Sequence, residues 1–248
     1  MRNALVSASG IIVNSADTGR ALERFAREER LPAPPQLVAH LGIQPAGSGG
    51  GAPLQAKPYF LSIGTIEGRK NHKLLLDAWD KLRVQLGADT PDLVLVGQRG
   101  WMAEETFARL DASPAEHGRI VELARCSDAE LDAWICHARA LLMPSKVEGY
   151  GLPVFEAMLR GTPVIAADLA IYREIAGGVP LLLDPDDAPA WADAARDYLH
   201  DCPDRLRQKA AMEKTITTGW ADHMALVDSW LSDLGAKGPE TALETVRN

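Results

Sequence analysis

The sequence contains few cysteines and no excess of positive charge. Its 248 residues include three cysteines, Cys126, Cys136 and Cys202, and none belongs to a Cys-x-x-Cys pair. An odd number of cysteines without such a pair favours reduced thiols in a cytosolic protein over a disulfide framework. Lys and Arg number 26 against 34 Asp and Glu, so the formal net charge is −8. This balance argues against a nucleic-acid partner.

Long apolar runs are also lacking. The run at 138–143 is interrupted by Arg139 and is far shorter than the roughly 20 residues that a membrane-spanning helix needs. Residues 1–15, MRNALVSASGIIVNS, lack the hydrophobic centre and cleavage site of a signal peptide. We therefore expect a cytoplasmic protein. Any association with the inner face of the membrane is expected only through parts outside this chain.

Short apolar runs alternate with longer amphipathic segments between residues 58 and 183. Such alternation is typical of a parallel sheet covered by helices on both faces. The sequence therefore predicts a doubly wound α/β domain, whose ligands bind at the loops that follow the strands. The predicted strands are 59–63, 93–96, 120–123, 140–143, 163–166 and 181–183. The predicted helices are 71–86, 102–110, a helix from Ser127, and 153–160 capped by Gly161.

The segment that precedes this domain is too short to bury a core alone. Residues 1–44 contain a predicted strand at 10–13, a helix at 17–30 and a strand at 37–41. A linker rich in Gly, Pro and Ser follows at 45–57.

The C-terminal part of the chain is predicted to be helical. Three helical segments span 188–234, with breaks near Pro203 and Gly219. We place the α/β domain at 58–217 and a C-terminal helix and tail at 218–248.

The loop after the first predicted strand combines glycines with two adjacent cations. Residues 64–71 read GTIEGRKN. Glycines allow close backbone approach, and the start of the next helix offers free N–H groups. Arg69 and Lys70 add a planar fork and a point charge, which suit a diphosphate. The alternative is a solvated surface loop, since the pattern matches neither the P-loop nor the dinucleotide fingerprint.

A second loop carries two carboxylates separated by seven residues. Residues 144–156 read PSKVEGYGLPVFE, with Glu148 before a glycine pair and Glu156 in the following helix. A carboxylate accepts hydrogen bonds from vicinal hydroxyls, which suits a sugar or a ribose. The alternative is that Glu156 caps its helix and Glu148 is exposed.

Residues 58–234 resemble the C-terminal, nucleotide-sugar-binding half of the retaining GT-B glycosyltransferases of family four (glycosyltransferase group 1), a Rossmann-like domain. Residues 1–44 resemble the last αβ unit of that family's first domain. The segments that carry the resemblance are ASGIIVNSADTGRAL, IGTIEGRKN, LVLVGQRG, RCSDAELDAWICHARALLMPSKVEGYGLPVFEAMLRGTPVIAAD, REIAGG, LLLDP and Gly219-Trp220.

The resemblance implies a role for each matching residue. Lys70 and Arg69 would neutralise the donor diphosphate, Glu148 would contact the transferred sugar, and Glu156 would hold the ribose. The base would lie near Gly97 and residues 121–126. Many family members have Arg where Thr65 stands, and Gly68 replaces a proline. The other implied substrate-binding residues are Gly64, Thr65, Gly149, Tyr150, Gly151 and Leu152.

The resemblance also implies an activity. The expected reaction transfers a sugar from a GDP-mannose-like donor, with retention, to a glycan or lipid acceptor that the residues do not identify. No cofactor or metal is expected, and an N-terminal acceptor domain would be missing from this chain. Two alternatives remain: a non-catalytic nucleotide-binding module and a nucleotide-sugar epimerase of the same fold.

Three further features predict no chemistry of their own. The sequence Asp184-Pro-Asp186-Asp187 spells a metal-binding Asp-x-Asp, but we expect an ordinary turn after the last strand. His72 adjoins the cationic loop, and we expect it to be solvated at its helix start. Ser145 lacks the nucleophile elbow of a hydrolase.

Overall fold

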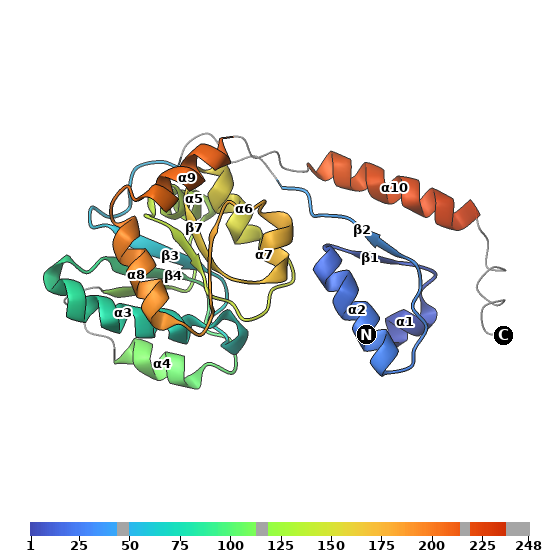
Figure 1. The fold of residues 1–248 in the computed structure, drawn as a ribbon, viewed down its shortest axis with the longest axis horizontal. Helices are drawn as coiled ribbons and strands as arrows, with labels where there is room; N and C mark the ends of the chain where they lie inside the picture. The colour runs from blue at the N-terminus through green and yellow to red at the C-terminus, as the bar shows by residue number, and fades with distance from the viewer. Residues whose placement is uncertain (44–49, 113–118, 214–218, 237–248) are drawn as a thin grey trace. The chain divides into compact units, whose positions relative to one another are not determined.

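The chain folds into two compact units, which are described separately. The computed structural model describes residues 1–43, 50–112, 119–213 and 219–236 (Figure 1). The larger unit is Pro45–Thr215, and the smaller unit combines Met1–Gln44 with Ile216–Asn248. The C-terminal helix therefore belongs with the N-terminal segment, an association that no pattern in the sequence predicts. The finer domain boundaries stay a prediction, and part of the proposed linker lies outside the described residues.

The larger unit contains a six-stranded, all-parallel sheet, which confirms the predicted doubly wound α/β class. Its strand order is β5-β4-β3-β6-β7-β8. Every predicted strand is present, with ends shifted by a residue at most. The strands are β3 (Tyr59–Ile63), β4 (Asp92–Val96), β5 (Ile120–Leu123), β6 (Leu141–Met143), β7 (Val164–Ala167) and β8 (Leu181–Leu183).

Helices connect these strands. Within the described residues, no helix is both long enough and apolar enough to span a bilayer. The helix α5 begins at a capping box, in which Ser127 and Glu130 bond each other's backbone N–H groups. The helices are α3 (His72–Leu86), α4 (Glu104–Asp111), α5 (Asp128–His137), α6 (Leu152–Leu159), α7 (Ala170–Ile175), α8 (Ala188–Tyr198) and α9 (Pro203–Met212), with short 3₁₀ turns η1 (Gly68–Lys70) and η2 (Gly87–Asp89).

The main core lies between α3, α8 and the sheet. Trp79 of α3 is fully buried and meets Phe60 of β3 edge to face, with ring centroids 5.7 Å apart. Its indole N–H donates to the Pro91 carbonyl at 2.9 Å. Trp191 of α8 donates similarly to the Asp184 carbonyl at 2.9 Å. Both large rings are thus buried with their polar atom satisfied.

The strand order creates a switch point between β3 and β6. From β3 the chain continues to β4 and β5 on one side of the sheet, and then returns to β6 on the other side. The loops after β3 and β6 therefore diverge at the carboxyl edge. A crevice at such a point is the usual ligand site of an open parallel sheet.

The smaller unit is one strand–helix–strand element with two further helices. The elements are α1 (Arg2–Ser7), β1 (Ile11–Val13), α2 (Ala16–Glu28), β2 (Gln36–Val38) and α10 (Trp220–Ala236), and β1 pairs with β2 in parallel. The strand–helix–strand order agrees with the sequence, whereas α1 is not predicted.

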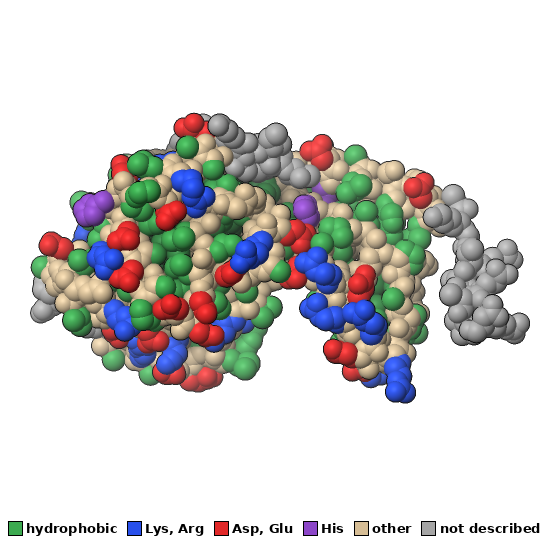
Figure 2. Space-filling model, viewed as in Figure 1, with side chains coloured by type: hydrophobic (Ala, Val, Ile, Leu, Met, Phe, Trp, Pro, Cys, Tyr) green, Lys and Arg blue, Asp and Glu red, His purple; other side chains and the backbone are tan. Residues whose placement is uncertain are grey.

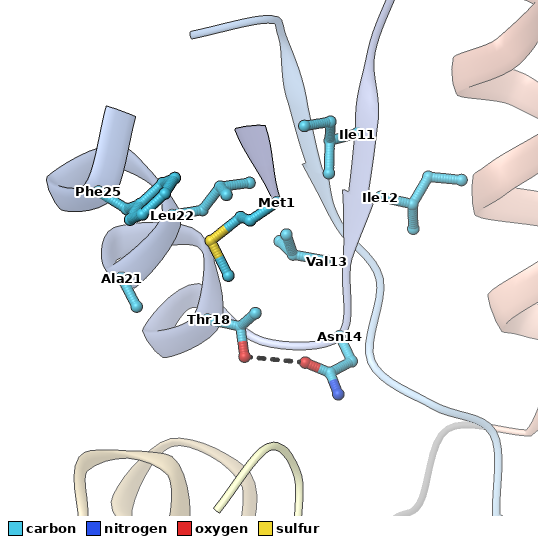
Figure 3. Close-up of a pocket in the computed structure, with 9 residues that line it drawn as sticks. All are labelled: Met1, Ile11, Ile12, Val13, Asn14, Thr18, Ala21, Leu22 and Phe25. Carbon is cyan, nitrogen blue, oxygen red and sulfur yellow. Dashed lines mark hydrogen bonds between the residues drawn. The ribbon is translucent and has the colours of Figure 1, made fainter. Parts of the chain in front are cut away.

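Side chains of β1 and α2 line an apolar depression of 680 Å³ in the smaller unit (Figure 3). Leu22 and Phe25 come from α2, and Val13 comes from β1. At its edge the Thr18 hydroxyl donates to Asn14 Oδ1 at 3.0 Å. Acidic and basic side chains are interspersed on the face of the molecule that Figure 2 presents.

Candidate functional site

Lys70 and Glu148 meet at the switch point. Lys70 ends η1 after β3, and Glu148 lies in the loop after β6. The Lys70 Nζ lies 2.6 Å from Glu148 Oε1, although 78 positions separate the two residues. The side chains are 13% and 6% exposed. The alternative of an exposed Glu148 is therefore wrong, because the β3 loop covers it.

Arg69 extends the cluster toward solvent. Its Nε lies 2.7 Å from Glu67 Oε1, and its Nη1 lies 3.5 Å from Glu148 Oε2. The Glu67 carboxylate is buried, whereas the Arg69 side chain is 48% exposed. Two cations thus face two carboxylates at the mouth of the crevice.

Ser145 and Tyr172 lie near Glu148. The buried Ser145 hydroxyl donates to Glu148 Oε1 at 2.7 Å. Burial, and then the negative charge of Glu148, raise the pKa of Tyr172 on α7, so its hydroxyl stays protonated. Gly151 has φ +88°, and a Cβ there would lie 2.6 Å from Tyr172 Cε1. Glycine is therefore required where the loop crosses this ring.

His72 is buried, so the expectation of a solvated side chain is wrong. The reason is the preceding residue, Asn71, which adopts a left-handed conformation at φ +56°. Its Nδ2 donates to the Pro144 carbonyl at 3.1 Å and the Pro185 carbonyl at 2.8 Å. These bonds tie the β3 loop to the loops after β6 and β8. Burial, and then the Lys70 charge, lower the pKa of His72 to about 4, so it is neutral at pH 7.

An open depression of 590 Å³ follows the carboxyl ends of β3, β4 and β5. Gly64, Thr65 and Gly97 line it, as does Ala124. A Cβ on Gly64 would lie 3.4 Å from the Lys70 side chain, so the depression adjoins the cation. A Cβ on Gly97 would lie 2.0 Å from the Gly64 carbonyl oxygen, so glycine alone allows the two loops this approach.

The loop before α6 contributes backbone rather than side chains. Gly151 is the N-cap of α6, and no side chain caps this helix end. Pro153 has no N–H, and the Val154 N–H donates to the Gly151 carbonyl at 3.0 Å. Of the first three residues of α6, only Leu152 therefore has a backbone N–H for an anion at this helix end. Tyr150 is buried and stacks on Phe155 with centroids 5.6 Å apart. Gly149 in this loop and Leu152, the first residue of α6, are exposed.

Glu156 stands apart from the cluster. It lies in the second turn of α6 and is half-buried. Within the part of the chain that the structure describes, its carboxylate has no hydrogen-bond or ion-pair partner. It does not cap its helix, because it lies five residues beyond the N-cap Gly151. Its assignment to a ribose stays a prediction.

The acidic turn after β8 is held by local structural bonds. Asp187 caps α8 by accepting from the Ala190 N–H at 3.0 Å. Asp186 pairs with Lys146 at 2.7 Å, and Asp184 accepts from the Asp186 N–H at 2.9 Å. Among the described residues, no three His, Cys, Asp or Glu side chains are grouped to hold a metal ion.

Three supporting residues, Glu67, Asn71 and Tyr172, were not singled out from the sequence, and Ser145 was considered only as a hydrolase nucleophile. Glu67 and Asn71 flank the two cations, and Ser145 precedes Glu148 by three positions. Their nearness to the predicted cations and carboxylate was the available signal. No sequence signal pointed to Tyr172, because only the fold brings α7 close to the loop after β6.

Comparison with known proteins identifies the family of this chain. The model of the family described as "Glycosyl transferases group 1" matches residues 57–201, more than half of the chain. O-antigen chain mannosyltransferase B of Escherichia coli is 36% identical over 132 residues, 53% of this chain and 34% of that protein. O-antigen chain mannosyltransferase RfbU of Salmonella typhimurium is 28% identical over 177 residues, 71% of this chain and 47% of that protein.

Solved structures share the fold. Sucrose-phosphate synthase from Thermosynechococcus elongatus has a TM-score of 0.70 at 22% identity, covering 96% of this chain and 61% of that one. A UDP-forming α,α-trehalose-phosphate synthase from Burkholderia xenovorans has a TM-score of 0.74 at 15% identity, covering 94% and 62%.

The chain thus spans about a third of the length of O-antigen chain mannosyltransferase B. The family match falls on the parallel sheet and the loops that hold Lys70 and Glu148. The resemblance to glycosyltransferase group 1 is confirmed, and the chain belongs to the group 1 glycosyl transferases.

Proposed function

We propose that this chain is the donor-binding portion of a glycosyltransferase that uses a nucleotide-diphosphate sugar. The donor is GDP-mannose-like, and the sugar passes with retention to a glycan or lipid acceptor. The observation that carries the proposal is the contact of Lys70 with Glu148 at the switch point, beside the depression that Gly64 borders. The names of the mannosyltransferase relatives support the choice of sugar.

The cluster suits a departing diphosphate. The positive charges of Lys70 and Arg69 are balanced by Glu67 and Glu148, so the cluster can take up an anion only if a cation turns toward it. Lys70 turns its ammonium to the diphosphate, while Ser145 keeps its hydrogen bond to Glu148. The N-terminal end of α6 adds the Leu152 N–H and a positive dipole end. Fixed positive charge of this kind stabilises the leaving group as its charge grows.

Glu148 and Glu156 take the hydroxyls of the ligand. Glu148 accepts from the transferred sugar and Glu156 from the ribose. The cations and the helix end serve the diphosphate without a metal, so EDTA should leave nucleotide affinity unchanged. The acceptor binds to a missing N-terminal domain. We therefore expect this chain alone to bind the donor nucleotide and to turn it over poorly.

Calorimetry with GDP, UDP and ADP tests the proposal. Lys70→Ala should weaken binding of the preferred diphosphate by about tenfold or more, because a charged hydrogen bond is lost. Glu156→Ala should also weaken it. Lys81→Ala is the matched control, since Lys81 is an exposed lysine of α3. If binding survives both Lys70→Ala and Glu156→Ala unchanged, the assigned site is wrong.

Two product measurements separate the alternatives. Retention requires that the anomeric configuration of the donor appears in the product, which proton NMR of the purified glycoside reports. An epimerase would instead interconvert nucleotide sugars without an acceptor. A non-catalytic module would neither form a glycoside nor interconvert nucleotide sugars, even in the presence of an acceptor domain.

A further inference from the structure

The depression beside Lys70 ends on an exposed tryptophan. Trp101 follows β4, lines the depression and is 66% exposed. In the larger unit, the other tryptophans, Trp79, Trp134 and Trp191, are buried. An indole left largely in water at the edge of a concave site provides a flat apolar surface that a ligand can cover.

Backbone hydrogen bonds fasten the Trp101 loop to the cationic loop. Ile66 N donates to the Gln98 carbonyl at 2.8 Å, and Gly100 N donates to the Ile66 carbonyl at 3.0 Å. Gly68 N donates to the Trp101 carbonyl at 3.2 Å. Three bonds therefore hold the two loops in register. The backbone of Trp101 is therefore held beside the loop that carries Lys70, which suits a ligand that engages both residues.

Arg99 lines the same depression, but its charge is already neutralised. Its guanidinium makes two bonds of 2.8 Å to Glu122 and one of 2.7 Å to Asp111. The group lies over the Phe107 ring, 5.3 Å from its centroid. Held in this way, it contributes a planar surface rather than a free cation. This end of the depression therefore favours a flat, weakly charged group over a phosphate.

We propose that Trp101 is a stacking platform for the nucleotide base, with Arg99 as a second flat surface of the same subsite. The proposal rests on the proposed function. The ligand runs along the carboxyl edge of the sheet, with its diphosphate at Lys70 and its base at Trp101. Gly64 and Gly97 line the depression that also reaches Trp101, and a Cβ on Gly64 would lie 3.4 Å from the Lys70 side chain.

Titration calorimetry with GDP and with inorganic pyrophosphate tests this subsite. Trp101→Ala should weaken GDP binding by about tenfold, in the range for loss of an aromatic stacking partner. Pyrophosphate affinity should change by less than about twofold, because it has no base to stack. Trp101→Phe should stay within about threefold of the unaltered chain for GDP. Val84→Ala, at an exposed apolar position far along α3, is the control.

The outcomes separate the two proposals. If GDP binding depends on Lys70 but Trp101→Ala leaves it unchanged, the stacking role is wrong and the proposed function stands. If Trp101→Ala weakens GDP and pyrophosphate equally, the residue acts on the diphosphate loop and the base subsite is also rejected. If the unaltered chain binds no nucleoside diphosphate, both proposals fall.

Discussion

The larger and smaller units use the same strand–helix–strand element but bury it to different degrees. Strands β3 and β4 of the larger unit are almost entirely buried. In the smaller unit, Ile12 of β1 and Val38 of β2 are 41% and 38% exposed. A parallel strand needs neighbours on both edges and helices on both faces to bury a continuous apolar run. Two strands cannot provide this, whereas six can.

Exposed apolar side chains also differ in their location. In the smaller unit they lie on helices and strands, including Val6 of α1 and Met224 of α10. In the larger unit many lie on loops around the candidate site, at Trp101, Met102 and Val147. Exposed apolar side chains therefore reflect an incomplete core in the smaller unit and a binding edge in the larger unit.

The largest effect should come from the core of the larger unit. Trp79→Ala removes a fully buried ring and should lower the free energy of unfolding of that unit by about 4 kcal/mol. Urea unfolding followed by circular dichroism and hydrogen exchange should show the smaller unit unaffected. Val84→Ala, on the exposed face of α3, should change little. If both units lost stability together, they would unfold as one cooperative body, and the difference between their cores would not hold.

A smaller, pH-dependent effect should come from His72. Its pKa is lowered from 6.5 to about 4, so the unfolded chain binds a proton in this range and the folded chain does not. The neutral, buried His72 therefore leaves the free energy of unfolding undiminished above pH 6.5. As the pH falls from 6.5 toward 4, protonation of His72 in the unfolded chain lowers the free energy of unfolding by about 3 kcal/mol. His72→Leu should remove that part of the acid destabilisation of the larger unit. Urea midpoints at pH 7.5 and pH 4 measure it, and equal acid losses in both proteins would contradict the burial of a neutral His72.

Gly42 tests packing in the smaller unit. A Cβ at this position would lie 2.4 Å from both the N and the Cα of Trp220. Gly42→Ala must therefore displace the first turn of α10, at about 2 kcal/mol. Hydrogen exchange should report faster opening of α10, with β3 and β4 of the larger unit unchanged. If α10 exchanges as in the unaltered chain, its contact with this segment does not hold the smaller unit together.

The smallest effect should have the opposite sign. Gly235 lies in α10, and among the described residues no atom beyond its chain neighbours and the backbone of its own helix lies within 4 Å of a Cβ built there. Gly235→Ala should stabilise the smaller unit by about 0.5 kcal/mol, because alanine is the better helix former and the position is near the helix end. The same urea experiment measures the change. A loss of stability would contradict the open space around Gly235.

The elements that could be predicted carry strong local signals. The strand at 59–63 is a continuous apolar run, and α5 begins at the expected Ser127. The helices α1 and α7 were not predicted, because each has only six residues and shows no clear periodicity. The pairing of α10 with the N-terminal segment could not be predicted either, since it depends on contacts across most of the chain.

The candidate site divides in the same way. Lys70, Arg69, Glu148 and the loop glycines could be chosen from residue type and spacing. The hydrogen bond from Ser145, the burial of His72 and the position of Tyr172 could not, because each depends on the packing of loops from different strands.

The amino-acid sequence by itself determined the strand–helix alternation and the chemistry of the two loops, because hydrophobic period, capping and charge are properties of neighbouring residues. Only the tertiary structure decided that Lys70 and Glu148 touch, that His72 is neutral and that Trp101 borders the same depression. The physical reason is that these properties depend on distance and burial, which a parallel sheet sets by bringing together residues that lie far apart in the chain.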